Sequence, residues 1–354
     1  MQLSFKNLTI PQLKDAFSTL GEPSFRWKQV LKWVYQKRVD RFDQMSNVSK
    51  KTRQVLAGHF RLFKLDVSNL LISRKNDAAK FGFRLRDNAI IESVLLYDKN
   101  RRTACISSQL GCGLGCTFCE TGKMGFFRNL SQEEILGQLI GINDYLESRG
   151  DKLLSNIVFM GMGEALSNYA NFRAAVEIIM DENGFCFGGR KITVSTAGVV
   201  PSIKRLMKEN LNLGLAISLN SWNNKSRSRI MPVNRKYPIE TLIKIAQEYF
   251  QTTGRRVTFE YVVIEGHNDG NDAVEGILRL LNGVTCKINL IPANPCSAYG
   301  DISSSERKIS DMAQKLSAGG INATIRKSRG RDICGACGQL SSTESICVYK
   351  NAKV

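Results

Sequence analysis

The chain has 354 residues, of which 43% are hydrophobic and 23% charged, so it can bury a full-sized core in one large domain with a smaller attachment. Lys and Arg number 50 against 32 Asp and Glu, and the resulting net charge of +18 favours a polyanionic partner. No run approaches the roughly 18 apolar residues of a membrane span, and residues 1–10 lack the features of a signal peptide. We therefore expect a cytoplasmic protein with no membrane partner. Ten cysteines in such a protein indicate thiols and metal ligands instead of structural disulfides.

Residues 1–60 have the pattern of a small basic helical domain. Helices are expected at residues 10–20 and 25–37, separated by a Gly-Glu-Pro break. This segment holds eleven Lys or Arg against four Asp or Glu, with aromatic residues interleaved. Most of these aromatics are expected to form a small core. A basic helical domain can also grip RNA, because phosphate contacts supply affinity and aromatic faces stack on unpaired bases.

Residues 61–100 are predicted to form short β-strands that connect this domain to the rest, including strands at 81–85 and 89–97. From residue 103 onward, apolar β-branched runs alternate with amphipathic stretches. Strands are predicted at residues 103–107, 156–160, 191–195, 213–219, 257–264 and 287–291. Helices are predicted at residues 131–147, 171–180, 201–208, 239–250, 273–281 and 305–316.

Several helix starts carry local signals. Ser131 and Ser303 each stand three residues before a glutamate, which predicts capping boxes, and Pro201 and Pro238 suit a first helical turn. Repeated strand–helix units imply a parallel sheet with right-handed crossovers. About six units are visible, too few for an eight-fold barrel. In either form, active-site residues are expected just past the C-terminal ends of the strands.

Three cysteines follow the first of these strands in a glycine-rich loop. Cys112, Cys116 and Cys119 have the spacing C-x3-C-x2-C. Three thiolates would leave one iron of a cubane iron-sulfur cluster open, and an open iron can bind a substrate or cofactor. The alternative is a structural zinc site, which usually takes four Cys or His ligands in short paired spacings. The chain's two histidines, His59 and His267, do not stand in that register.

Motifs over nearly the whole chain resemble those of the RlmN/Cfr family of radical S-adenosylmethionine (SAM) RNA adenine methyltransferases. In chain order they are Cys105-Ile-Ser-Ser-Gln, the cysteine triad, Arg128-Asn129-Leu130, Gly161-Met162-Gly163-Glu164-Ala165-Leu166, Ser195-Thr196-Ala197-Gly198 and Ala336-Cys337-Gly338-Gln339-Leu340. The resemblance implies an α/β fold in which residues 101–330 form a radical SAM partial (β/α)6 barrel. The N-terminal helical domain would be an accessory RNA-binding domain, and residues 331–354 would carry a methyl-carrier cysteine.

The resemblance also implies a function. Such enzymes methylate C2 of an adenosine in 23S rRNA at the peptidyl transferase centre and, in part of the family, a tRNA adenosine near the anticodon. The implied cofactors are a [4Fe-4S] cluster and two SAM molecules per turnover. The implied partners are the rRNA and tRNA substrates and an electron donor such as flavodoxin, and we expect a monomer. A base that is to be modified must be unstacked and placed in the pocket.

Catalytic roles follow from the same resemblance. Cys337 would be methylated by one SAM to S-methylcysteine, and a radical derived from a second SAM would take hydrogen from that methyl group. An adenine C2 or C8 carbon is electrophilic and cannot attack SAM directly, whereas a tethered carbon radical can add to it. Cys105 would release the product by attacking the sulfur of Cys337, and it is also a candidate for removing the ring proton. Glu92 matches a family glutamate assigned acid/base work.

A further set of strand-end residues matches family positions that hold SAM. Residues of these types could also be ordinary turn or capping residues, so the resemblance carries the assignment. They are Gly163, Glu164, Ser195, Ser218, Leu219, Asn220 and Asn294.

The chain departs from the family pattern at three places. Asn220 stands where relatives often have His, and Cys334 forms an unexpected C-x-x-C pair with Cys337. Ala165 and the Thr-Gly-Lys run at residues 121–123 resemble the branch that methylates C8 and confers antibiotic resistance, whereas the N-terminal domain resembles the C2 branch at least as well. C8 methylation therefore stays open as the alternative activity. A non-catalytic, zinc-containing RNA-binding protein is the remote alternative.

Overall fold

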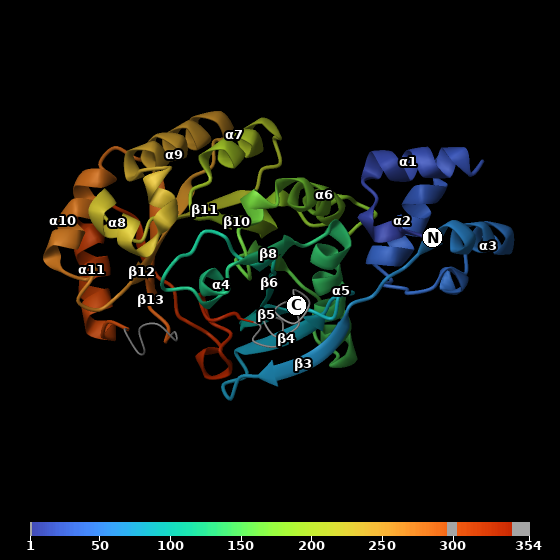
Figure 1. Ribbon diagram of the computed structural model, residues 1–354, viewed down its shortest axis with the longest axis horizontal. Coiled ribbons are helices and arrows are strands. Elements are labelled where there is room, and N and C mark those ends of the chain that lie inside the picture. The colour runs from blue at the N-terminus through green and yellow to red at the C-terminus, as the bar shows by residue number, and fades with distance from the viewer. Residues whose placement is uncertain (1, 296–302, 342–354) are drawn as a thin grey trace, which may run out of the picture.

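The computed structural model describes residues 2–295 and 303–341, so residues 342–354 of the expected C-terminal segment lie outside the described residues. Its centre is a ten-stranded sheet with the order β14-β13-β12-β11-β10-β9-β6-β5-β4-β3 (Figure 1). Seven neighbouring strands are parallel. They are β6 (Arg101–Cys105), β9 (Asn156–Phe159), β10 (Ile192–Thr196), β11 (Gly214–Ser218), β12 (Val257–Val263), β13 (Cys286–Pro292) and β14 (Ala323–Ile325).

Helices connect the parallel strands and cover the outer face of the sheet (Figure 1). They are α5 (Gln132–Ser148), α6 (Tyr169–Met180), α7 (Val200–Lys208), α8 (Asn224–Ile230), α9 (Ile239–Thr253), α10 (Asn271–Leu280) and α11 (Glu306–Ala318). Six strand–helix units and a closing strand result. The two end strands β14 and β3 do not pair with each other, so the sheet is open. The predicted α/β fold with a partial (β/α)6 barrel is confirmed.

The local signals at helix starts were mostly informative. Ser131 and Glu134 form the predicted capping box of α5, and Pro201 lies in the first turn of α7, whereas Pro238 is the N-cap of α9. The box predicted from Ser303 was wrong, because Ser303 pairs as an isolated β-bridge with Ile264 and is thereby held in extended backbone. Helix α11 is capped instead by Ser305, which accepts a hydrogen bond from the Lys308 N–H.

The segment at residues 61–100 forms three antiparallel strands, β3 (Asp66–Ile72), β4 (Ala78–Arg84) and β5 (Ile90–Asp98). Strand β5 pairs with β6, so this segment extends the same sheet beyond the first barrel strand in addition to connecting it to the N-terminal domain. All residues of β3 are exposed. Strand β3 lies within the segment predicted to form short strands but had no bounds of its own, and β14 was not predicted; both are edge strands without a buried apolar face.

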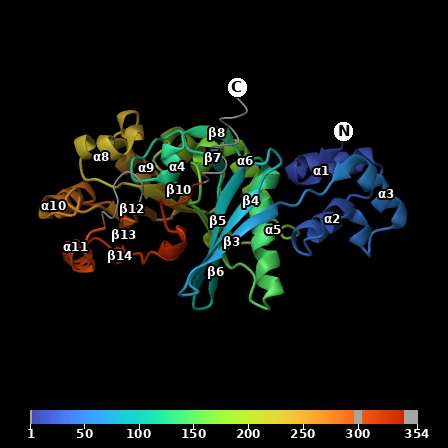
Figure 2. The same cartoon turned by 60° about the horizontal axis from the view of Figure 1, so that its bottom comes forward.

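The N-terminal domain is a separate lobe beside α5 (Figures 1 and 2). It comprises β1 (Leu3–Ser4), α1 (Ile10–Thr19), α2 (Arg26–Tyr35), α3 (Lys50–His59) and β2 (Phe60–Arg61), with β1 and β2 paired in parallel. The Phe5 ring lies at its centre and makes edge contacts with the rings of Phe17, Phe42 and Phe60 at 6.4, 6.2 and 6.0 Å. Most of its aromatics do form a small core, but Phe25 remains 58% exposed.

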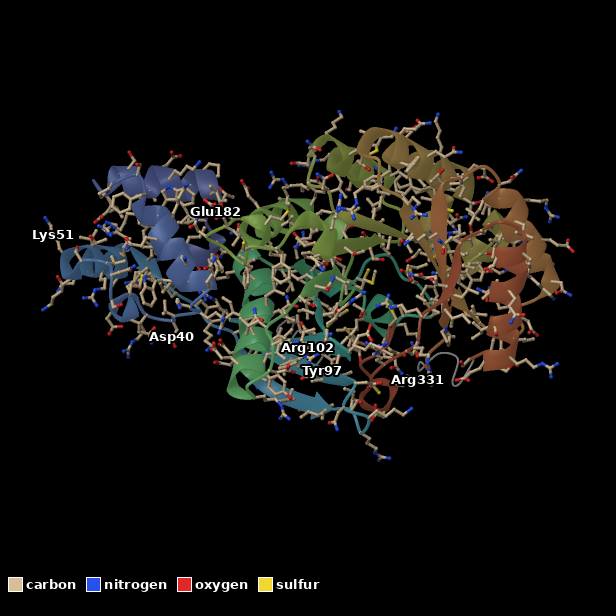
Figure 3. The ribbon with its side chains drawn as sticks, turned by 180° about the vertical axis from the view of Figure 1, so that it is seen from behind. Asp40, Lys51, Tyr97, Arg102, Glu182 and Arg331 are labelled. Carbon is tan, nitrogen blue, oxygen red and sulfur yellow. The ribbon has the colours of Figure 1, made fainter. Side chains whose placement is uncertain are left out.

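Polar contacts attach this lobe to the barrel. The Arg38 guanidinium reaches Asp144 at 2.8 Å and Glu147 at 2.6 Å on α5. The Gln36 Nε2 donates to the carbonyl of Glu182 at 2.8 Å, and Figure 3 shows Glu182 between the two parts. In the described part of the chain, no helix combines the length and apolar character that a membrane crossing requires.

Candidate active site

The cysteine loop is held in shape by two short strands and a tight glycine turn. Strand β6 ends at Cys105, and β7 (Gln109–Gly111) then pairs with β8 (Phe126–Asn129) across the base of the loop. Gly111 has a φ of +71°, and a Cβ there would lie 1.9 Å from the carbonyl oxygen of Gly125. The Cys112 N–H donates to that same oxygen at 2.8 Å. Only glycine therefore permits the loop to start in this way.

The three triad thiols are half-buried and lie at the end of the barrel where the C-terminal ends of the strands meet. The Leu114 N–H donates to the sulfur of Cys112, and backbone N–H groups of Thr121 and Gly122 donate to that of Cys119. Burial raises the pKa of Cys112 to about 12, so the site favours thiolates only when a cation compensates their charge. Within residues 2–295 and 303–341, no three His, Cys, Asp or Glu side chains are close enough to share one metal ion. A cubane binds each cysteine at a different iron, so its three ligands do not have to meet at one metal ion.

The Gly-Met-Gly-Glu motif follows β9 and lies directly beside the start of the cysteine loop. Gly163 has a φ of +91°, and a Cβ there would lie 2.4 Å from the side chain of Gln109. The buried Glu164 carboxylate accepts hydrogen bonds from the N–H groups of Ala197 at 2.8 Å and Leu166 at 3.2 Å. Burial nevertheless raises the pKa of Glu164 to about 7. Glu164 thus joins the ends of β9 and β10 at the cavity wall.

The strand ends surround a cavity of about 660 Å³. Eleven of the thirteen predicted site residues line it, most of them at or just past the C-terminal ends of different strands. The predicted residues that line the cavity are Cys105, Cys112, Cys116, Cys119, Gly163, Glu164, Ser195, Ser218, Asn220, Asn294 and Cys337.

 The two of these residues that lie farthest apart in the sequence are Cys105 and Cys337. The structure therefore brings together residues that are up to 232 positions apart in the chain.

The Ala-Cys-Gly-Gln-Leu segment packs directly against the cysteine loop. The Glu120 N–H donates to the carbonyl of Gly338 at 2.7 Å, and the Thr121 hydroxyl donates to that of Leu340 at 2.6 Å. Gly338 has a φ of +83°, and a Cβ there would lie 2.9 Å from the carbonyl oxygen of Phe118. These contacts place Cys337 on the cavity wall, where Asn294 Nδ2 donates to its carbonyl at 3.0 Å. The Cys105 and Cys119 thiols both lie close to Cys337, because a negative charge on Cys337 raises the pKa of each of them.

Two predicted residues do not line the cavity. Glu92 lies on the same face of β5 as Val94, which does line it, but the Glu92 carboxylate is engaged by Lys80 at 2.8 Å and by the Ser341 N–H at 2.9 Å. Leu219 is buried, and its backbone bonds to Glu260 and Arg227 instead. Glu92 therefore contacts the segment that carries Cys337, whereas Leu219 supports the strand ends from behind.

Asn220 lines the cavity, but its side chain already has protein partners. Its Oδ1 accepts from the Val262 N–H at 2.8 Å, and its Nδ2 lies 3.3 Å from Met231 Sδ. Asn220 also has a φ of +57°, which asparagine tolerates better than most residues. Its side chain therefore fixes the β11 and β12 ends as well as facing the cavity.

Three charged residues of the site were missed by the sequence reasoning. Arg227 is fully buried and bonds to carbonyls at the β10 and β11 ends. Glu260 on β12 is 6% exposed, and Arg326 directly follows β14; both line the cavity. Their signal in the sequence was weak, because a lone charge in or after an apolar run predicts a site only when its strand is known to face a cavity.

The cavity also fits the implied cofactors. Beside the three thiols, the Oδ1 of Asn294 and the Oε2 of Glu260 are buried acceptors without a hydrogen-bond partner in the described residues. Buried acceptors of this kind need donors, and SAM carries ammonium, amino and hydroxyl donors. A set of thiols beside unpaired acceptors is what a cluster with SAM at its open iron requires.

Comparisons with known proteins point the same way. Residues 3–62 match the family "Ribosomal RNA large subunit methyltransferase N-terminal domain", and residues 106–281 match the "Radical SAM superfamily". The chain is 43% identical over 338 residues to the "Probable dual-specificity RNA methyltransferase RlmN" of Dictyoglomus turgidum, covering 96% of this chain and 95% of that protein. It is 39% identical over 350 residues to the "Dual-specificity RNA methyltransferase RlmN" of Desulfotalea psychrophila, covering 97% and 96%. The crystal structure of a radical SAM methyltransferase from Sphaerobacter thermophilus superposes with a TM-score of 0.90 at 41% identity, covering 96% and 99%.

Proposed function

Since the chain belongs to the RlmN family of radical SAM RNA methyltransferases, we propose that it methylates C2 of an adenosine in 23S rRNA and of a tRNA adenosine near the anticodon. The observation that carries this proposal is the placement of Cys337 and Cys105 in one cavity with the cysteine triad. The relatives named above carry the RlmN name, which favours C2 over the C8 activity suggested by Ala165.

The two cofactors have assigned places in this proposal. Cys112, Cys116 and Cys119 would bind the [4Fe-4S] cluster. SAM would be held by the remaining cavity residues, which are Gly163, Glu164, Ser195, Ser218, Asn220 and Asn294, with Leu219 fixing the strand ends behind them. Together the bound cofactors supply a methyl group and one-electron chemistry.

Cys337 is the proposed methyl carrier. Its thiol faces the cavity, and its backbone is fixed by Asn294 and by the contacts of Gly338 and Leu340 with the cysteine loop. A carrier thiol is needed because adenine C2 is electrophilic and does not attack a methyl donor. The fixed backbone keeps the carried carbon within the same cavity as the base that receives it.

Cys105 is the proposed resolving thiol. Once the carbon joins Cys337 to the base as a thioether, the Cys105 thiolate attacks the Cys337 sulfur. The S–S bond forms and the S–C bond breaks. The released electron pair stays on the carbon, which takes a proton and becomes the methyl group. A dithiol reductant then reduces the resulting disulfide to two thiols and is itself oxidised to a disulfide.

Glu92 is proposed to exchange protons near the carrier. Burial raises its pKa, and the Lys80 ammonium opposes that effect. Its hydrogen bond to Ser341 links it to the segment four residues beyond Cys337. Movement of that segment would uncover the carboxylate toward the cavity.

RNA is the proposed macromolecular substrate. The cavity is flanked by Arg101, Lys327 and Arg329, and positive charge at an active-site entrance suits a phosphate backbone. The exposed Phe25 on the basic N-terminal lobe offers a further stacking surface, with the Arg26 guanidinium 5.1 Å from its ring centroid. We further propose that the protein is a monomer and that it receives electrons from a donor such as flavodoxin.

Replacing Cys105 by alanine tests the assigned chemistry. The anaerobically reconstituted variant should accumulate a covalent protein–RNA adduct on an rRNA fragment, because the thioether then has no thiol to resolve it. Denaturing gels and mass spectrometry of the adduct and of the nucleoside made by the wild type are the measurements. Normal turnover by the variant would contradict the role of Cys105, and an 8-methyl nucleoside would contradict the proposed ring position.

A further inference from the structure

Arg326 crosses the open side of the barrel. It follows β14, and its N–H donates to the Leu290 carbonyl on β13 at 2.9 Å. Its Nη1 lies 3.3 Å from the Sδ of Met160, which directly follows β9 near the other end of the parallel strands. The side chain therefore reaches from the last barrel strand to the side where Cys105 lies.

The guanidinium of Arg326 has few partners. Among the described residues, the thioether of Met160 is its one hydrogen-bond acceptor, although a guanidinium has five N–H donors. The carboxylate of Glu260 is 3.9 Å away, beyond hydrogen-bond distance, and its Oε2 has no hydrogen-bond partner there either. Most of the hydrogen-bonding capacity of Arg326 is thus available to a group in the cavity.

Two thiols face this guanidinium. The Met160 N–H donates to the sulfur of Cys105, which places that thiol next to the residue that Arg326 contacts. Burial raises the pKa of Cys105 to about 12, and the charge of Arg326 opposes this rise. The same charge lowers the pKa of Cys337 against the effect of burial. Arg326 therefore lies within electrostatic reach of both sulfurs.

Two other basic residues in this part of the structure are held in closer ion pairs than the 3.9 Å pair of Arg326 with Glu260. Lys80 is paired with Glu92 at 2.8 Å, and Arg329 with Asp98 at 2.9 Å. Arg326, by contrast, is the cation whose charge acts on both Cys105 and Cys337.

We propose that Arg326 is a positioning residue that stabilises the negative charge present as the Cys105 thiolate attacks the Cys337 sulfur and the carbon departs, when the protein–RNA thioether is resolved. This rests on the proposed function. During the attack, charge that begins on the Cys105 sulfur spreads over both sulfurs and the departing carbon. A nearby cation with available N–H donors lowers the energy of that arrangement, because it attracts the developing negative charge.

The test follows adduct release in Arg326→Met and Arg326→Lys. In a single-turnover time course, Arg326→Met should release the adduct about tenfold or more slowly than the wild type, as expected when the cation that compensates a developing charge is removed. Arg326→Lys should recover part of the rate, because it retains the charge. The dissociation constant for the RNA fragment should stay within about twofold, since the proposed effect is on a step after binding.

Arg331→Met is the matched control. Arg331 lies five residues further along the same segment, is exposed and is not among the residues that line the cavity (Figure 3). This variant should release the adduct at the wild-type rate. Iron content and circular dichroism of each variant show whether the cluster and fold are retained.

Adduct release by Arg326→Met at the wild-type rate would overturn the inference. So would a loss of RNA affinity that accounts for the whole effect, because Arg326 would then be a phosphate contact. These outcomes are separate from the failure of the proposed function. If Cys105→Ala accumulates adduct while Arg326→Met releases it normally, the resolving thiol stands and only the role of Arg326 fails.

Discussion

Arg227 on α8 organises the strand ends that form one wall of the cavity, and its replacement by methionine should destabilise the protein strongly. The side chain is 0% exposed. Its Nε donates to the Leu219 carbonyl at 2.8 Å, and its Nη2 donates to the carbonyls of Ala197 at 2.8 Å and Ser218 at 2.7 Å. Its Nη1 donates to Asn234 Oδ1 at 3.0 Å. Burial lowers the pKa of Arg227 to about 10, so the group is still protonated at neutral pH.

The expected magnitude follows from these four contacts. Methionine fills much of the volume but donates nothing, and each buried acceptor left without a donor costs about 1–3 kcal/mol. Part of this cost is offset because no charge has to be desolvated, which leaves a net loss of about 3–5 kcal/mol. Such a loss is a large share of the stability of a typical domain. Since Ala197 and Ser218 line the cavity, SAM binding should weaken as well.

Urea unfolding of the cluster-free protein, followed by circular dichroism, measures the stability change, and equilibrium dialysis with SAM measures binding. Arg229→Met is the matched control, because Arg229 is exposed on the same helix. It should unfold within about 0.5 kcal/mol of the wild type. An Arg227→Met variant that also unfolds within that margin would refute the assignment of Arg227 as the group that holds these strand ends together.

Two further predictions concern other parts of the chain. Lys6 is 1% exposed and donates to the Phe63 carbonyl at 2.7 Å, and burial lowers its pKa from 10.5 to about 8. Between these two pKa values the unfolded chain binds more protons than the folded protein, so the free energy of unfolding should rise with pH from about 8 to 10.5, by up to about 3 kcal/mol in all. Below pH 8 both states are protonated and this group should cause no slope; Lys6→Met should remove the slope in urea titrations. Gly111→Ala should reduce iron and sulfide content after anaerobic reconstitution, because its Cβ would collide with the Gly125 carbonyl. Gly113→Ala, whose Cβ would make an ordinary contact at 3.4 Å, should reconstitute normally, and equal loading of both variants would contradict the steric argument.

The position of Cys337 shows which part of the site the sequence motifs could predict and which part they could not. The spacing of the triad predicts a cluster by itself, because its ligands lie within eight residues of one another. Nothing local in the sequence places Cys337 beside it, since the two are joined by hydrogen bonds such as that from Thr121 to the Leu340 carbonyl, across 219 positions. The family resemblance led us to expect Cys337 beside the triad, and the structure shows the hydrogen bonds that hold its segment against the cysteine loop.

The sequence by itself determined the order of the first six parallel strands and most of the helices between them, the cluster loop and the basic character of the N-terminal lobe. These depend on periodicity, spacing and composition, all of which act over short stretches of chain. Only the tertiary structure decided that Glu92 is covered by the Ser341 backbone, that Arg227 ties two strand ends together, and that Arg326 faces two thiols. The physical reason is that a buried charge depends on partners brought from distant strands, and no local pattern encodes which strands the closing sheet brings together.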